Sequence, residues 1–177
     1  MTSVPIRRYF PRMRRIPLRA AVMAVVVAIA AILILGRVTG ELAGATAAVK
    51  VLRVIDGDTI IVASGEGSET VRLLGVDTPE THHPTKPVGC WGPEAEAFSR
   101  AHLEGRLVTL EDDIERTDLY GRHLAYVHLD GERFNDRLLI EGYARILTIA
   151  PNGVYRRAML EEEMQAHRAN RGLWGNC

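Results

Sequence analysis

Two carboxylates, Asp77 and Glu80, follow an apolar run that is typical of a buried strand, residues 71–76. The run has to end at Thr78, because a residue that precedes proline is driven away from helical geometry. The two acids therefore lie in a turn at a strand end, where carboxylate oxygens can bind a hard cation. An isolated acidic turn of this kind is more often only solvated. The interpretation depends on what else the chain supplies.

A third carboxylate, Asp58, comes 19 residues before Asp77. It belongs to Asp56-Gly57-Asp58, which separates the β-branched runs 49–55 and 59–63 and predicts a tight turn. In a three-stranded meander the start of the second strand can lie beside the end of the third. Asp58, Asp77 and a backbone carbonyl could then hold one cation, and Ca²⁺ tolerates such an irregular oxygen shell better than Mg²⁺ does. The alternative for Asp58 is ordinary turn chemistry.

Two arginines could bind an anionic substrate beside such a cation. Arg72 lies on the strand that leads to Asp77, and Arg122 follows the turn Tyr120-Gly121. A planar guanidinium matches the geometry of a phosphodiester, which gains charge in its transition state. Glu80 could take a proton from an attacking water or orient that water. The alternative for either arginine is a simple ion pair with one of 22 acidic residues.

The remaining pattern predicts a small closed barrel with helices attached to it. Five strand-like runs are expected, at 49–55, 59–63, 71–76, 107–110 and 123–129, with residues 111–118 as an acidic link. One helix begins near Pro93 and stops at Gly105. A second helix is capped by Asn135, a short extended run covers 144–149, and a third helix follows Asn152-Gly153.

Charge divides the chain into two unlike parts. Residues 1–40 hold seven arginines and no acid, whereas 41–177 hold 15 basic and 22 acidic side chains, a net charge of −7. The body alone would therefore repel a polyanion. A basic stretch, 1–19, precedes the apolar residues 20–36, and residues 37–46 resemble a linker. The apolar segment is either a membrane anchor or a cleaved signal, and in both cases the body, 47–177, lies outside the cytoplasm.

Two cysteines, Cys90 and Cys177, lie far apart in the sequence. In a domain outside the cytoplasm an even pair favours a disulfide. The alternative is two unpaired thiols.

Five motifs occur in an order and spacing that resemble the thermonuclease (staphylococcal nuclease-like) family. They are VIDGDTIIV (54–62), RLLGVDTPE (72–80), GPEAEAF (92–98), DLYGRHLAYV (118–127) and FNDRLLIEGYARI (134–146). The resemblance implies an α+β fold, mainly β, in which a five-stranded OB-fold barrel carries three helices; the apolar residues 20–36 add one N-terminal helix before it. It also implies a monomeric, Ca²⁺-dependent hydrolase of DNA and RNA, favouring single strands, that leaves 3′-phosphate ends.

Carried onto this chain, the resemblance gives each candidate a role. Asp58 and Asp77 would bind calcium through carboxylates and Thr78 through its carbonyl, Arg72 and Arg122 would hold the phosphate, and Glu80 would act on water. Tyr120 would touch the nucleotide. Two departures bear on affinity: Leu119 replaces a basic residue, and Leu147 stands where a tyrosine lies near the base. The competing hypothesis is a non-catalytic barrel that binds nucleic acid or protein.

Overall fold

The computed structural model describes residues 47–177 except 66, 83, 84 and 86. Thr46–Cys177 forms one compact unit. The predicted basic stretch, apolar segment and linker, 1–46, lie outside the described residues. Within the described part, no helix has the length and apolar character needed to cross a membrane.

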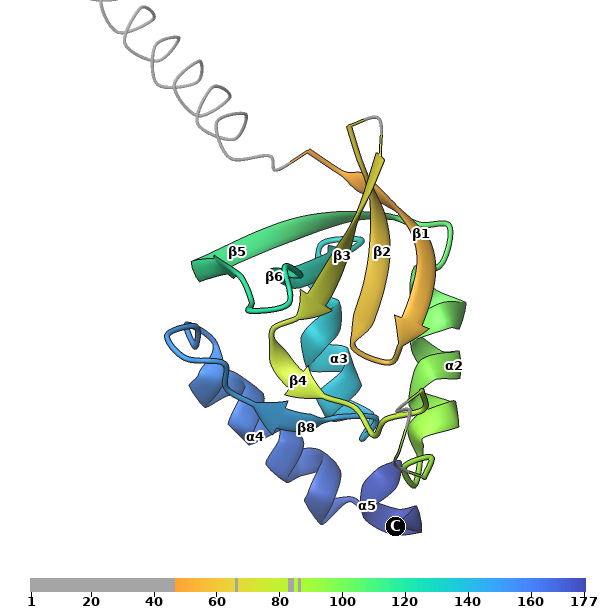
Figure 1. Cartoon of the computed structure of the whole chain (residues 1–177). Coiled ribbons are helices and arrows are strands. Elements are labelled where there is room, and N and C mark those ends of the chain that lie inside the picture. Colours follow the sequence, from red (N-terminus) through yellow and green to blue (C-terminus); the bar gives the residue numbers. More distant parts are fainter. Residues whose placement is uncertain (1–46, 66, 83–84, 86) are drawn as a thin grey trace, which may run out of the picture. The chain divides into compact units, whose positions relative to one another are not determined.

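The expected meander begins the fold. Strands β1 (Val49–Asp56), β2 (Thr59–Ser64) and β3 (Gly67–Leu73) pair antiparallel in sequence order. The turn between β1 and β2 is the predicted Asp56-Gly57-Asp58. Figure 1 shows the three strands side by side, with the β1–β2 turn at their lower end. The inward-facing apolar side chains Val51, Ile60 and Val71 are fully buried, whereas Leu52 is exposed, as alternation along half-buried strands requires.

Two long strands close the barrel. β5 (Leu107–Thr117) pairs with β1 and with β6 (His123–Leu129), and β6 also pairs in parallel with β3. The five strands β1, β2, β3, β5 and β6 therefore form a mixed closed barrel, which leaves few free edges. A two-residue strand, β7 (Glu132–Arg133), extends β6.

The prediction that residues 111–118 form an acidic link is wrong. Most of it continues β5, because β6 supplies main-chain partners such as Ala125 opposite Asp112. Acidic residues disfavour strands only weakly when their side chains stay at the surface, and Asp112 and Glu115 are exposed.

The predicted third strand is also split. β3 ends at Leu73, and the separate strand β4 (Gly75–Asp77) leaves the barrel to pair with β8 (Arg145–Leu147). Gly75 makes this bend at φ +79°, and a Cβ there would lie 2.5 Å from Met159 Sδ. The site residues on either side of the bend therefore belong to two different sheets.

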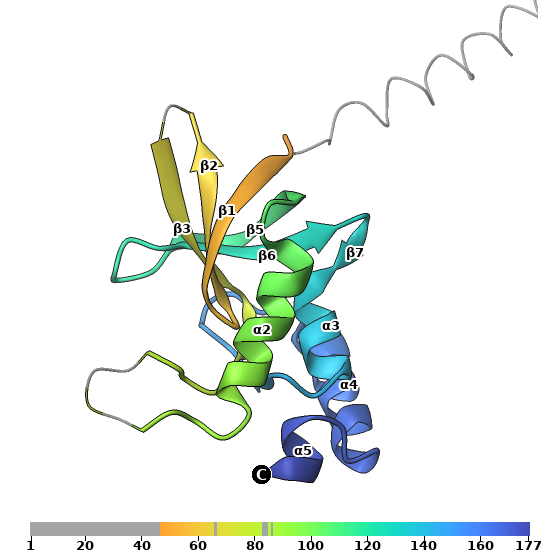
Figure 2. The ribbon, with the colours of Figure 1, turned by 90° about the vertical axis from the view of Figure 1, so that its right-hand side faces the viewer.

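The three predicted helices are present: α2 (Gly92–Leu103), α3 (Phe134–Ile140) and α4 (Arg156–Arg168). A fourth, single-turn helix, α5 (Leu173–Asn176), ends the chain. Figure 2 shows α2 alongside β1, with α3, α4 and α5 on the side of the molecule away from the tip of the β2–β3 hairpin. The predicted cap of α3 is wrong, because Asn135 lies inside the first turn and makes no capping bond.

Candidate active site

The turn between β1 and β2 presents Asp58 to the end of β4. The Asp58 side chain is almost buried, and its Oδ2 accepts the Thr78 N–H at 2.9 Å while Oδ1 accepts the Thr59 hydroxyl at 3.0 Å. Gly57 permits this approach, since a Cβ there would lie 2.7 Å from Thr78 Cγ2. The predicted contact between the start of the second strand and the end of the third is thus present.

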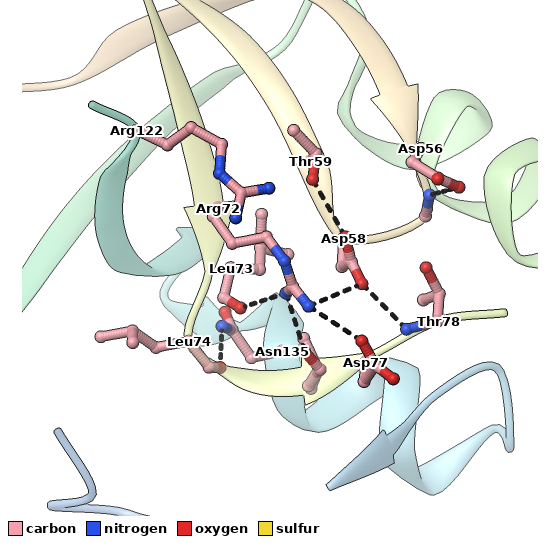
Figure 3. A network of polar contacts seen from close by, with 12 residues as sticks. Asp56, Asp58, Thr59, Arg72, Leu73, Leu74, Asp77, Thr78, Arg122 and Asn135 are labelled. Carbon is pink, nitrogen blue, oxygen red and sulfur yellow. Dashed lines mark hydrogen bonds and ion pairs between the residues drawn. The ribbon is translucent and has the colours of Figure 1, made fainter. Parts of the chain in front are cut away.

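Arg72 lies at the centre of the site. Its Nη2 is 3.1 Å from both Asp58 Oδ2 and Asp77 Oδ1, and its Nη1 donates to the carbonyls of Leu73 and Val76 at 2.8 Å each (Figure 3). Only 6% of this residue is exposed. A buried charge is tolerated when it is paired and hydrogen-bonded, so the guanidinium also fixes the bend between β3 and β4. Among the described residues its Nε–H has no hydrogen-bond partner.

Asn135 supports the same bend from α3. Its Nδ2 donates to the Leu74 carbonyl at 2.8 Å (Figure 3), and its Oδ1 accepts the Val127 N–H, also at 2.8 Å. Leu74 also donates its own N–H to Ala125 of β6 at 2.9 Å. This fully buried amide therefore ties the bend to β6. Its role was missed in the sequence, where Asn135 matched the pattern of a helix cap.

Glu80 completes a group of carboxylates. Burial raises the pKa of Glu80 above its usual value, and the neighbouring charges of Asp56, Asp58 and Asp77 raise it further. Burial likewise raises the pKa of Asp77, although Arg72 counteracts this shift. The ionised forms of Glu80 and Asp77 are thus disfavoured, and a bound cation would relieve this.

The donors suit a hard cation rather than a softer one. Asp58 and Asp77 supply carboxylate oxygens and Thr78 supplies a backbone carbonyl, an all-oxygen set of the kind that Ca²⁺ accepts. Within residues 47–177, apart from the four undescribed positions, no three His, Cys, Asp or Glu side chains come close enough to hold a metal by themselves. The carbonyl and water would have to complete the shell.

Arg122 approaches from the loop between β5 and β6. The parallel register that pairs Arg72 with Leu124 brings this loop beside β3, and Figure 3 shows the Arg122 side chain next to Arg72. Its Nε donates to Asp118 Oδ2 at 2.6 Å. Burial alone would raise the pKa of Asp118, but the hydrogen bonds from Arg122 and from the Tyr120 N–H lower it below its usual value. Arg122 is therefore held by a carboxylate that stays ionised.

The loop that carries Arg122 also exposes two large side chains. Tyr120 is 85% exposed and lies 5.4 Å from the Arg122 guanidinium, measured from its ring centroid. Leu119 is fully exposed. An aromatic ring displayed beside a guanidinium is a surface on which a base can stack.

The two cysteines form the predicted disulfide. Cys90 and Cys177 are bonded, with their Cα atoms 6.0 Å apart. The bond links the segment before α2 to the last residue of the chain, on the far side of α5. Disulfides of this kind persist outside the reducing cytosol.

Known proteins are similar to this sequence over about 70% of its length. The family model described as "Staphylococcal nuclease homologue" matches residues 70–176. A protein named thermonuclease from Staphylococcus hyicus is 45% identical over 127 residues, which cover 72% of this chain and 75% of that protein. The thermonuclease of Staphylococcus intermedius is 46% identical over 124 residues, covering 70% and 74%. Endonuclease YncB of Bacillus subtilis is 39% identical over 124 residues, covering 69% and 59%. The chain belongs to the staphylococcal nuclease homologue family.

Proposed function

We propose that this protein is a Ca²⁺-dependent nuclease that hydrolyses phosphodiester bonds of DNA and RNA and leaves 3′-phosphate ends. The observation that carries the proposal is the position of Arg72, whose guanidinium lies 3.1 Å from both Asp58 and Asp77. The guanidinium that would bind the phosphate thus meets the two carboxylates that would bind calcium. The relatives named thermonuclease support the same reading.

Calcium would be held by Asp58, Asp77 and the Thr78 carbonyl. Bound there, it would supply positive charge to the phosphate and to the water that attacks it. Asp58 is well suited to be a fixed ligand, because it is buried and already oriented by the Thr78 N–H. Asp77 is half exposed at the end of β4 and can adjust.

The two arginines would bind the non-bridging oxygens of the scissile phosphate. Arg72 can offer its Nε–H without losing the contacts that fix the bend. Arg122 is bonded to Asp118 through Nε, which leaves its Nη groups to donate. Charge that develops on the phosphorus oxygens is stabilised by such fixed donors more strongly in the transition state than in the substrate.

Glu80 would act on the attacking water. Water would add to phosphorus opposite the 5′-oxygen, the bond to that oxygen would break as the oxygen takes a proton from solvent, and the 3′-oxygen would keep the phosphate. Glu80 either accepts the proton that the water loses or orients the water by a hydrogen bond. Its raised pKa would fall if a bound cation neutralised the neighbouring carboxylates.

We place this activity outside the cytoplasm, with residues 20–36 as a membrane anchor or, if cleaved, as an export signal. The Cys90–Cys177 disulfide supports an oxidising compartment. The protein would act as a monomer.

The test is hydrolysis by residues 47–177 of single-stranded DNA and RNA with calcium and with EGTA. We expect turnover with calcium, no turnover with EGTA, and products that a 3′-phosphatase can dephosphorylate. Full turnover in EGTA would remove calcium from the mechanism. Nucleic-acid binding without hydrolysis under any metal condition would favour the competing non-catalytic barrel.

A further inference from the structure

Arg145 lies directly opposite Asp77 in the strand pair β4–β8. Residues that face each other in antiparallel strands project from the same side. The preceding pair, Val76 and Ile146, points inward, since Val76 is fully buried and Ile146 packs against the core. Asp77 and Arg145 are both exposed. The arginine therefore shares the open face from which Asp77 would reach a cation.

Arg145 differs from the other two guanidinium groups of the site. Arg72 and Arg122 are each ion-paired, whereas no carboxylate among the described residues lies within 4 Å of the Arg145 nitrogens. Other basic residues of the described body, among them Arg137 and Arg171, also form no ion pair, so what sets Arg145 apart is its position. It lies next to a predicted metal ligand.

Trp174 holds Arg145 in place. The guanidinium carbon lies 4.7 Å from the centroid of the Trp174 ring. Stacking on an aromatic face occupies the plane of the guanidinium and leaves its in-plane N–H groups available. These N–H groups match the oxygens of a phosphate.

The segment that carries Trp174 is fixed to the body. Leu173 is buried and donates its N–H to the Gly142 carbonyl at 2.9 Å. Three residues after Trp174, Cys177 is bonded to Cys90. Arg145 is thus held by a ring that is anchored on both sides.

We propose that Arg145, positioned by Trp174, binds a phosphate adjacent to the scissile one in a single-stranded nucleic acid. The inference rests on the proposed function, because it takes the cleaved phosphate to lie at Arg72 and Arg122. Arg145 would also add a positive charge to the substrate-binding surface, where the loop that carries Tyr120 and Arg122 has the apolar Leu119. The subsite gives affinity for longer substrates and takes no part in bond cleavage.

The primary test is binding, measured by fluorescence anisotropy with the full-length protein and a labelled single-stranded oligodeoxynucleotide in EGTA. Arg145→Gln is expected to raise Kd about 3–10-fold and to lower the slope of log K against log salt by about 0.7, the value for one phosphate contact on a single strand. Arg157→Gln is the matched control, because it removes the same charge from a side chain that is 95% exposed on α4. An Arg145→Gln protein that binds like this control would overturn the proposal.

Neutral phosphate analogues locate the contact. One methylphosphonate is placed in turn at each position of the oligonucleotide, and wild-type and Arg145→Gln affinities are compared. At one position the analogue should weaken binding by the wild type and leave binding by the variant unchanged. The reason is that the analogue and the substitution remove the same interaction. If the analogue lowered the affinity of the variant as much as that of the wild type at every position, the effect of Arg145 would be a general electrostatic one, and a specific contact would be refuted.

Trp174 gives an independent check. Trp174→Leu should weaken binding in the wild type but not in the Arg145→Gln background, and Trp174→Phe should retain most of the affinity because it keeps a ring. Equal losses in both backgrounds would refute a positioning role. Cleavage with calcium is followed in parallel: if none occurs while the Arg145 effect on binding persists, the nuclease chemistry fails and the subsite stands.

Discussion

Asn135 on α3 donates its side-chain N–H to the Leu74 carbonyl, 61 residues earlier, at 2.8 Å. The carbonyl belongs to the bend that separates Arg72 from Asp77. No other described side chain joins α3 to this bend by a hydrogen bond. The positions of the ends of β3 and β4 thus depend on the Asn135 amide, which hydrogen-bonds to Leu74 between them and to neither strand.

We predict that Asn135→Leu lowers both stability and kcat. It leaves the Leu74 carbonyl and the Val127 N–H without partners in the core, which should cost about 2–4 kcal/mol in the free energy of unfolding. The bend should then shift, and kcat should fall because Arg72 and Asp77 move with it. Urea denaturation and steady-state kinetics measure the two effects.

Asn152 provides a matched control. It is also buried, and its amide bonds both main-chain groups of Glu115, at 2.8 and 2.9 Å. Asn152→Leu should lose comparable stability and retain kcat below the melting transition. Equal losses of kcat in both variants would mean that Asn135 affects only stability.

Arg122→Lys should lower kcat by about 10²–10³-fold with little change in melting temperature. Lysine keeps the charge but loses the forked donor set that matches a phosphate, and the side chain is 32% exposed. Arg106→Lys is the control, since this arginine also pairs with an aspartate, Asp130, at the surface. A folded Arg122→Lys protein with normal rates would show that Arg122 serves only as the partner of Asp118. Arg72→Lys is a poorer test, because it also strips two main-chain carbonyls of their donor.

Glu162 should make stability depend on pH. This carboxyl lies on α4, and its Oε2 is buried without a hydrogen-bond partner among the described residues. Burial raises its pKa to about 7, the charge of Asp136 raises it too, and Arg133 counteracts both. The folded protein therefore binds this proton more tightly than the unfolded chain does. The stabilisation is complete below about pH 4.5 and is lost as the pH rises through 7.

The expected loss is about 1–2 kcal/mol between pH 5 and pH 8, less than the full shift implies because solvent reaches part of the group. Glu162→Gln should remove this difference, as measured by urea denaturation at the two pH values. Glu161→Gln is the control, because the neighbouring Glu161 side chain is 66% exposed. An identical pH dependence in wild type and Glu162→Gln would contradict the assignment.

Reduction of Cys90–Cys177 should lower the melting temperature without abolishing calcium-dependent activity. The bond closes a loop of 87 residues, for which stabilisation of about 2–4 kcal/mol is typical. The body has its own buried core, so it should stay folded at moderate temperature. Thiol titration of the natively exported protein should find no free cysteine, and two reactive thiols would contradict an extracytoplasmic location.

Local sequence explains why part of the site could be predicted. Asp58 lies in a tight turn, and the meander that follows brings Asp77 beside it through neighbouring strands. Contacts of this kind follow from hairpin geometry. Arg72 was expected on the same strand as Asp77, and only the bend at Gly75 places the two on different sheets.

Long-range contacts explain what was missed. The sequence of residues 111–117 predicts a polar link, because its side chains are mostly charged. The strand that pairs with it, β6, lies on the other side of a loop and leaves no local pattern in these residues. Asn135 precedes a helical pattern and so resembles a cap, while its partners, Leu74 and Val127, lie on other elements. A buried amide between distant segments has no local pattern by which a sequence could reveal it.

The split between β3 and β4 has a consequence for when the protein becomes active. Asp58 and Arg72 belong to the barrel, whereas Asp77 is held in place by β8, which ends only at Leu147. A chain still emerging from the ribosome therefore lacks the strand that pairs with β4 and positions Asp77 until Leu147 has been made. Late assembly of the site would therefore delay any attack on the nucleic acids among which such an enzyme is synthesised.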